Sequence, residues 1–97
     1  MRTEVFDAII HAPKRLQICA LLAPNASVEF STLKQQLDVS DSVLSKHIKT
    51  LEDVDYVLMN KKIVNNRKRS WLSLTAKGRK AFVAHVNALK AMVGESL

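Results

Sequence analysis

The sequence predicts a mainly α-helical protein that carries one small β-hairpin. Apolar residues recur at the spacing of a helix face through most of the chain, whereas strand-like runs are short and few. Two of these runs flank an asparagine pair, Asn65-Asn66, of the kind that suits a hairpin turn. With 97 residues and 10.9 kDa, the chain is long enough for a single core. We therefore expect residues 1–97 to form one domain.

Two helices are predicted before residue 25. Thr3 can cap the first helix, and Pro13 either interrupts this helix or starts a second segment. The second helix is strongly apolar and ends at Pro24 and Asn25. It contains Cys19, the only cysteine of the chain, so no intramolecular disulfide can form. We interpret Cys19 as a buried structural thiol without chemistry of its own.

The next segment has the organisation of a helix-turn-helix. Residues 27–30 alternate between polar and apolar types and predict a short strand, after which Ser31 caps a helix over residues 32–37. Leu33 and Leu37 are expected to point inward. The tripeptide 38–40 then joins this helix to the next one. Asp38 occupies the turn, where aspartate tolerates the left-handed conformation better than most residues.

The helix predicted over residues 40–54 is the main functional candidate. Ser40 is a good N-cap, and Asp41 suits the positive end of the helix dipole. Helical spacing divides the remaining side chains into a core face with Val43, Leu44, Ile48 and Leu51, and an opposite face with Ser42, Ser45, Lys46 and Lys49. Short hydroxyl side chains followed by lysines suit a helix end that enters the DNA major groove. The alternative is a solvated amphipathic surface helix.

A β-hairpin is predicted after this helix. Residues 57–64 form its first strand, residues 65–69 its turn, and residues 70–74 alternate into the return strand. Three consecutive cations, Arg67, Lys68 and Arg69, then lie at the tip, where they can contact phosphates or an adjacent minor groove. The alternative is a solvated loop whose charges serve solubility.

The last helix is predicted to start at Thr75, its N-cap. Gly78 lies within its first turns, where glycine lowers helix stability, so we expect a close approach to another backbone. The apolar stripe of this helix extends beyond a small core and comprises Phe82, Val83, Val86, Leu89, Met92 and Val93. We expect the terminal segments, residues 1–12 and 79–97, to form a homodimer interface that includes Val5, Phe6, Ile9, Phe82, Val86, Leu89 and Val93. Packing of the stripe on its own domain alone is the alternative.

Charge is distributed unevenly along the chain. The formal net charge is +6, yet residues 1–39 carry as many acidic as basic side chains, so the whole excess lies after residue 39. This asymmetry indicates a polyanionic partner, although a basic surface can also serve solubility. No apolar run approaches the length of a membrane span and no signal peptide opens the sequence, so we expect a cytoplasmic protein without a membrane partner.

These segments together resemble the winged helix-turn-helix family of small bacterial and archaeal transcriptional regulators, closest to its MarR and ArsR groups. The resemblance is carried by the run from Leu37 to Glu52, by Tyr56-Val57, and by the stretch from Trp71 to Arg79 with its Leu-Thr-x-x-Gly-Arg pattern. Asp55 departs from the glycine often seen just before the first strand of the wing, which is the β-hairpin of such proteins.

The resemblance implies a homodimeric, sequence-specific DNA-binding regulator that recognises double-stranded DNA at a palindromic operator. The helix over 40–54 would enter the major groove and the wing over 65–69 would contact the backbone or minor groove. The residues implied at the DNA are Thr32, Lys34, Ser40, Ser42, Ser45, Lys46, Lys49, Asn66, Arg67, Lys68 and Arg69. No cofactor is expected and no effector is identified. One cysteine and three scattered histidines (His11, His47 and His85) provide no metal-ligand set, and we interpret His47 as a packed side chain.

Two further hypotheses compete with a regulator. In the first, the winged helix is a protein-interaction or assembly module whose apolar terminal helices are functional and whose DNA affinity is only nonspecific. In the second, the protein is an enzyme, which the sequence disfavours because it contains no phosphate-binding glycine loop, nucleophile-and-base pair or paired-carboxylate motif.

Overall fold

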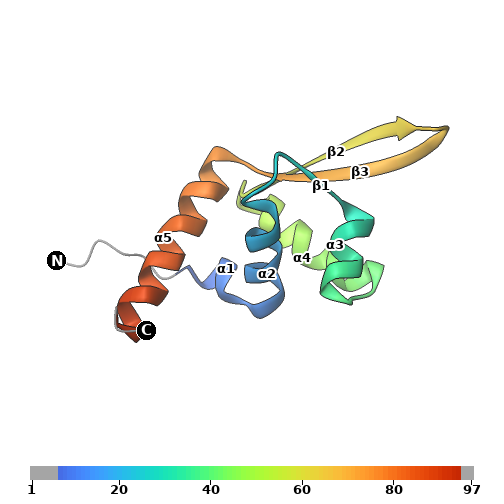
Figure 1. Cartoon of the computed structure of the whole chain (residues 1–97). Coiled ribbons are helices and arrows are strands. Elements are labelled where there is room, and N and C mark those ends of the chain that lie inside the picture. The colour runs from blue at the N-terminus through green and yellow to red at the C-terminus, as the bar shows by residue number, and fades with distance from the viewer. Residues whose placement is uncertain (1–6, 95–97) are drawn as a thin grey trace.

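The computed structural model describes residues 7–94 and contains five helices and three strands within that range (Figure 1). The predictions made for Thr3, Val5 and Phe6 lie outside the described residues. In chain order the elements are α1 (Ala8–His11), α2 (Pro13–Leu22), β1 (Val28–Glu29), α3 (Phe30–Leu37), α4 (Asp41–Asp53), β2 (Val57–Val64), β3 (Arg67–Leu74) and α5 (Ala76–Val93). The predicted fold class, mainly α with a small β-hairpin, is confirmed.

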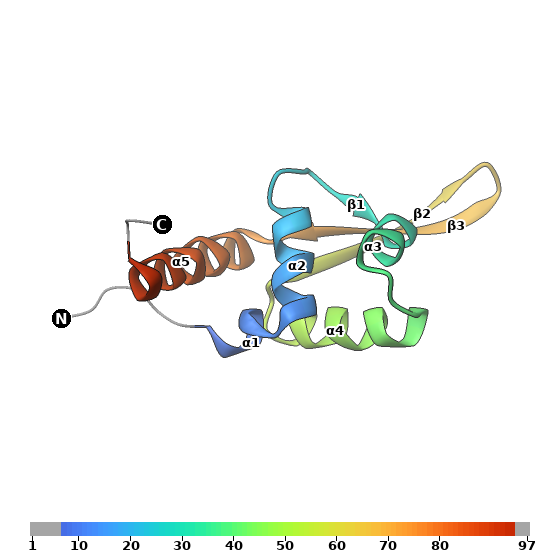
Figure 2. The same ribbon diagram turned by 60° about the horizontal axis from the view of Figure 1, so that its bottom comes forward.

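The three strands form one antiparallel sheet in the order β1-β3-β2. Figure 2 shows the β2–β3 hairpin projecting past α3 at one end of the molecule, while α5 extends away at the other end. The described residues are accordingly elongated, with extents of 53 × 25 × 21 Å. β1 pairs only with Leu72 and Trp71 of β3, so the outer half of the hairpin is two-stranded.

A single core lies between the sheet and helices α1 to α4. Leu33 and Leu37 of α3 point inward as predicted. The other side chains of this core cluster are Ile10, Ile18, Cys19, Leu22, Leu44, Ile48, Leu51, Val57, Leu72 and Leu74. The predicted burial of Cys19 is confirmed, and this burial raises the pKa of its thiol to about 11, which keeps it protonated at neutral pH.

Two predicted boundaries are wrong. The strand expected over residues 27–30 is only Val28–Glu29, and α3 begins at Phe30 instead of after a Ser31 cap. The ring of Phe30 packs against the core, so the chain turns into the helix earlier than local alternation indicates. Glu29, in extended conformation, is the N-cap and makes no side-chain capping bond.

The hairpin turn is shorter than predicted. Asn65 and Asn66 alone form it, with φ angles of 52° and 63°, because both asparagines adopt the left-handed conformation that a tight two-residue turn requires. Val64 pairs directly with Arg67. The three cations assigned to the turn therefore lie on β3, where successive side chains point to opposite faces.

Two aspartates occupy left-handed positions that glycine would fill more readily. Asp38 has φ 54° at the C-terminus of α3, which confirms the turn predicted there. Asp55 has φ 62° and connects α4 to β2. Asp55 therefore adopts the left-handed conformation that glycine often provides before the first strand of the wing, and the chain enters β2 in the expected direction.

Gly78 marks the point where α5 meets the root of the hairpin. The Thr75 hydroxyl caps α5 by accepting the Gly78 N–H at 2.8 Å, as predicted. A Cβ on Gly78 would lie 2.0 Å from the carbonyl oxygen of Tyr56 and 2.7 Å from its carbonyl carbon. The predicted close approach of two backbones is therefore confirmed. Among the described residues, no helix combines the length and apolarity that crossing a bilayer requires.

Candidate nucleic-acid interface

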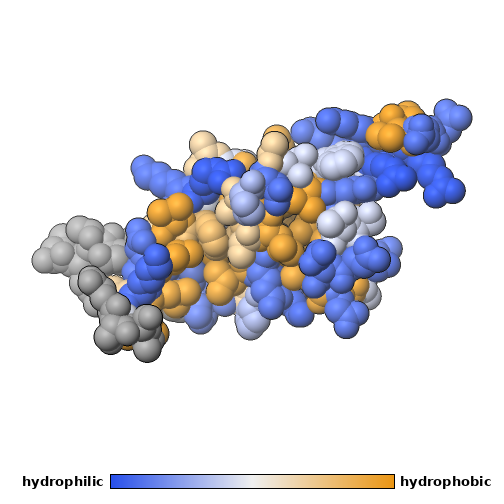
Figure 3. Space-filling view, viewed as in Figure 1, coloured by the Kyte–Doolittle hydropathy of each residue, from blue (hydrophilic) through white to orange (hydrophobic). Residues whose placement is uncertain are grey.

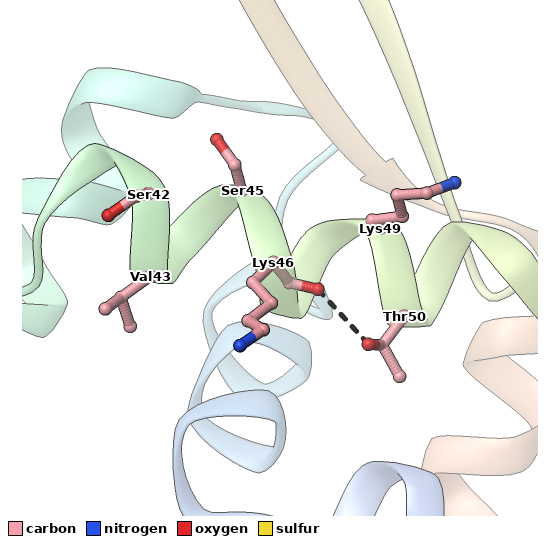
Figure 4. A pocket seen from close by; sticks show the side chains of 6 residues that line it. All are labelled: Ser42, Val43, Ser45, Lys46, Lys49 and Thr50. Carbon is pink, nitrogen blue, oxygen red and sulfur yellow. Dashed lines mark hydrogen bonds between the residues drawn. The ribbon is translucent and has the colours of Figure 1, made fainter.

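Helix α4 presents a polar face because its core side chains fix its rotation. Leu44, Ile48 and Leu51 are fully or almost fully buried. The Ser40 hydroxyl accepts the Val43 N–H at 3.2 Å and defines the first turn, as predicted. The four side chains predicted on the polar face of this helix, Ser42, Ser45, Lys46 and Lys49, are consequently all exposed (Figure 4).

The exposed face of α4 is an open hollow lined by Ser42, Val43, Ser45, Lys46, Lys49 and Thr50. In Figure 4, Ser45 and Lys49 point to one edge of this surface, and Val43, Lys46 and Thr50 point to the other. The Thr50 hydroxyl donates to the Lys46 carbonyl at 3.1 Å. The prediction that Val43 belongs to the core face is wrong, since its side chain is 41% exposed. Val43 lies at the edge of the buried arc, and Leu44 fills the core beside it.

The lysines near this surface differ in their partners. Lys49 is 3.3 Å from Asp53 and Lys34 of α3 is 2.8 Å from Asp41, and all four side chains are well exposed. Such surface pairs are weak and can exchange for phosphate contacts. Lys46 forms no ion pair with any other residue in the 7–94 range. It is therefore the cation on α4 that is most available to an external anion.

Helix α3 lies beside the N-terminal part of α4, as in a helix-turn-helix. Thr32 and Lys34, for which the family resemblance implies flanking phosphate contacts, are both exposed on it. The ammonium group of Lys14 on α2 donates to the carbonyl oxygen of Leu37 at 3.2 Å and braces the C-terminal end of α3.

The hairpin separates the predicted tip cations into two faces. Arg67 lies on the same face as Arg69, whereas Lys68 lies on the face that continues the core side of the sheet. Asn66, Arg67 and Lys68 are exposed, but Arg69 is half-buried and its guanidinium lies 2.7 Å from the Glu29 carboxylate. Figure 3 shows the hairpin end as mostly hydrophilic with a small hydrophobic area. Arg69 thus fastens the hairpin to β1, while Arg67 and Lys68 remain open to solvent.

His47 lies on the inner edge of α4 and faces α2. Its Nδ1 is 3.3 Å from the Arg15 guanidinium, which also donates to the carbonyl oxygen of Ile9. Burial lowers the pKa of His47, and the charges of Arg15, Lys46 and Lys14 lower it further. A neutral imidazole here accepts a hydrogen bond from Arg15, so the geometry supports its interpretation as a packed side chain.

A polar network that joins α1, α5 and the residue preceding β2 was not predicted from the sequence. The fully buried His85 accepts the Asp7 N–H at its Nδ1 (3.0 Å), and its Nε2 is 3.3 Å from Nδ1 of His11. The Tyr56 hydroxyl donates to the Asp7 carboxylate at 2.7 Å, which raises the pKa of Tyr56 to about 12. The helical spacing of His85 places it among the apolar residues of α5. This spacing is the sequence signal from which its burial could have been predicted.

We expect the free energy of unfolding to fall as the pH is lowered below about 6.5. Burial lowers the pKa of His85, with the nearby His11 adding to the effect, and burial also lowers that of His47. The unfolded chain therefore binds protons near pH 6.5 that the folded chain does not yet bind, and stability decreases until the folded-state pKa values are passed. Urea denaturation between pH 5 and 8 measures this slope.

The matched variant for this test is His85→Asn, whose side-chain oxygen can still accept the Asp7 N–H. Carboxylates contribute equally to the pH dependence of stability in both proteins. The difference between the two slopes of unfolding free energy against pH is therefore the contribution of His85. Identical slopes for the variant and the parent would contradict this prediction.

The predicted dimer residues within the described range differ in exposure. Ile9 of α1 and Phe82, Val86 and Leu89 of α5 are half-buried, whereas Val93 of α5 is 57% exposed. Val83 and Met92, which belong to the same stripe, are 53% and 63% exposed. The apolar surface of α5 is thus least covered toward its C-terminal end. Within the described residues, no cluster of His, Cys, Asp and Glu is arranged to hold a metal ion.

A helix-turn-helix with an exposed serine–lysine helix and a neighbouring β-hairpin defines a winged-helix protein. The chain belongs to the winged helix DNA-binding domain family, whose model matches residues 14–93. It is 31% identical over 83 residues to an uncharacterized protein of Methanocaldococcus jannaschii, MJ0432, with 86% of each chain covered.

Solved structures show the same relationship. The transcriptional regulator homologue protein of Pyrococcus horikoshii OT3 superposes with a TM-score of 0.83 at 30% identity, covering 88% of this chain and 84% of that one. The transcriptional repressor BigR of Xylella fastidiosa superposes with a TM-score of 0.65 over 90% of this chain and 82% of its own. At 22% identity, the second match shows the shared fold alone. The resemblance to MarR- and ArsR-like winged-helix regulators is therefore confirmed.

Proposed function

We propose that this protein is a sequence-specific transcriptional regulator that acts in the cytoplasm as a homodimer, with α4 in the major groove and the hairpin on the adjacent backbone or minor groove. The observation that carries the proposal is the exposed face of α4. It combines the hydroxyls of Ser42 and Ser45 with the ammonium group of Lys46, which forms no ion pair within residues 7–94, on a helix whose opposite side is anchored in the core.

The hairpin and α3 support the same docking geometry. Arg67 and Lys68 project from the two faces of the hairpin and Lys34 is exposed on α3, so the two elements near α4 also carry exposed cations. A helix in the major groove with phosphate contacts on either side is the usual arrangement of helix-turn-helix proteins.

Dimerisation is supported by the exposed apolar side chains of α5. Val83, Met92 and Val93 are each more than half exposed on one helix, which is a costly surface for a monomer in water. Two copies joined through α5 would bind half-sites about 10 bp apart, or a multiple of this distance, on one face of the DNA. The same surface also favours the alternative function, an interaction module that binds DNA only through charge.

The experiment that tests the proposal is selection from a random pool of duplex DNA at two salt concentrations, with sequencing of the bound fraction. A regulator enriches one palindromic motif at both concentrations. Binding that enriches no motif and disappears at the higher salt would refute sequence specificity and support the interaction module. Sedimentation of the protein alone measures its oligomeric state independently.

Lys46→Ala and Lys49→Ala are expected to weaken binding to the selected site to different extents. A lysine that contacts phosphate contributes to all sequences equally, whereas a lysine that contacts guanine contributes about 1–3 kcal/mol at one base pair. We expect the larger loss for Lys46, because Lys49 must give up its pair with Asp53 on binding. Titration of selected and scrambled duplexes with each variant measures both effects. Unchanged affinity in both variants would remove α4 from the interface.

A further inference from the structure

The side chain of Val43 is the one apolar aliphatic group among the six residues that line the hollow of α4. It is 41% exposed and lies outside the core, although it sits next to the fully buried Leu44. Single exposed apolar residues are common on proteins, so exposure alone indicates nothing. What distinguishes Val43 is its place, in the first turn of a helix whose surrounding side chains are hydroxyls and lysines.

The position of Val43 fits the base edges of a major groove. The residues of the first turns of a recognition helix are those that reach base edges. Val43 and Lys46 are three residues apart and point to the same edge of the hollow in Figure 4. A phosphate or a guanine is a suitable ligand for Lys46, but neither offers an apolar contact to the isopropyl side chain of Val43.

The DNA group that matches an apolar side chain in the major groove is the C5 methyl of thymine. It is the only apolar group that the four base pairs present there, and apolar side chains are its usual partners. Val43 is also stiff, because β-branched side chains hold one rotamer in a helix. Docking on a methyl group therefore costs it little conformational freedom.

We propose that Val43 determines part of the sequence specificity by packing on a thymine methyl group in each half-site. This inference rests on the proposed function, since it names one base that the same helix reads. The operator accordingly contains a thymine at a fixed position in each half-site, next to the base pair or phosphate contacted by Lys46.

The test replaces the thymines of the selected operator by uracil, one symmetric pair at a time. Uracil lacks only the methyl group, so every hydrogen bond of the base pair is retained. Burial of one methyl group changes affinity by about fourfold, so loss of one methyl per half-site should weaken dimer binding roughly fifteenfold. We expect this loss at one symmetric thymine pair with the parent protein.

The decisive comparison is with Val43→Ala, which keeps the helix because alanine is the better helix former. We expect Val43→Ala to bind the thymine operator about as weakly as the parent binds the uracil operator, and to be insensitive to uracil at that pair. Val43→Thr retains one methyl group and should respond to an intermediate degree. Leu58→Ala, which truncates another exposed apolar side chain on β2 and outside the surface lined by α4, should keep the full response of the parent.

Three outcomes would overturn the inference. A Val43→Ala variant that responds to uracil as the parent does would show that another residue reads the methyl group. A parent protein insensitive to uracil at every thymine would exclude any such contact while leaving sequence-specific binding intact. Failure of the parent to enrich a motif would instead refute the proposed function, and the thymine contact with it.

Discussion

Replacement of Gly78 by alanine is expected to lower the free energy of unfolding by about 3 kcal/mol or more, the upper end of the usual cost of overpacking. In an open helical position the same change would stabilise the protein by about 1 kcal/mol, because alanine is the better helix former. Here the new Cβ would lie 2.0 to 2.8 Å from three backbone atoms of Tyr56. Backbone atoms cannot move aside as a flexible side chain can, so the sign of the effect is reversed.

The measurement is urea or thermal denaturation of Gly78→Ala beside the parent protein. A loss of 3 kcal/mol in a domain of this size corresponds to a fall in the midpoint temperature of more than about 10 °C. Ala76→Gly is the matched control, since residue 76 is exposed in the first turn of the same helix and the change should cost only about 1 kcal/mol. A Gly78→Ala protein as stable as the parent would show that α5 can move away from Tyr56 freely.

Simultaneous replacement of Arg67 and Lys68 by alanine is expected to weaken DNA binding by roughly two orders of magnitude at 50 mM salt. Each phosphate contact contributes about 0.9 to the slope of log affinity against log salt, so the slope should become shallower by about 1.8. Both side chains are exposed on the two-stranded end of the hairpin, and their removal leaves the core unchanged. Binding titrations at four or more salt concentrations measure the slope directly.

The control for net charge is the double variant Lys80→Ala and Lys90→Ala on α5, which removes the same two charges from exposed positions elsewhere. It should leave the slope unchanged. If both double variants lower the slope equally, the effect is one of overall charge and the hairpin makes no specific phosphate contact.

Arg69 is left out of this variant because of its contact with Glu29. A half-buried ion pair that loses one partner leaves the other charge poorly solvated, so Arg69→Ala should reduce stability as well as affinity. The sequence alone predicts the same DNA-contacting role for Arg67, Lys68 and Arg69, because no local pattern distinguishes Arg69 from the other two. The separation arises from the strand order β1-β3-β2, which brings Glu29 next to Arg69 across forty residues.

Local signals predicted several features in which one residue type decides the conformation, although the Ser31 cap was wrong. The Ser40 and Thr75 caps, the left-handed Asp38 and the close approach at Gly78 each follow from the chemistry of a single side chain or its absence. The bounds of α4 follow from the same reasoning. These features explain why the fold class and the orientation of α4 were predicted correctly.

Features that depend on distant residues were not predictable in this way. The bonds of Asp7 to Tyr56 and His85 span 49 and 78 residues, and no periodic pattern marks them. Val43 was misassigned for a related reason, because helical spacing places it at the edge of the core face and only its neighbours decide on which side it lies. Long-range contacts therefore determined both the Asp7 network and the position of Val43.

The Arg69–Glu29 ion pair also divides the hairpin mechanically. Inward of it, Trp71 and Leu72 of β3 lie between β1 and β2, and outward of it only two residue pairs, Ile63–Lys68 and Val64–Arg67, connect β2 to β3. A two-stranded ribbon without further support is only marginally rigid. The hairpin is thus held firmly at its root and is more flexible at its free end. In the proposed complex with DNA, we expect this flexibility to let Arg67 and Lys68 follow a minor groove whose width varies with sequence, so that operators of different local shape are bound without a movement of α4.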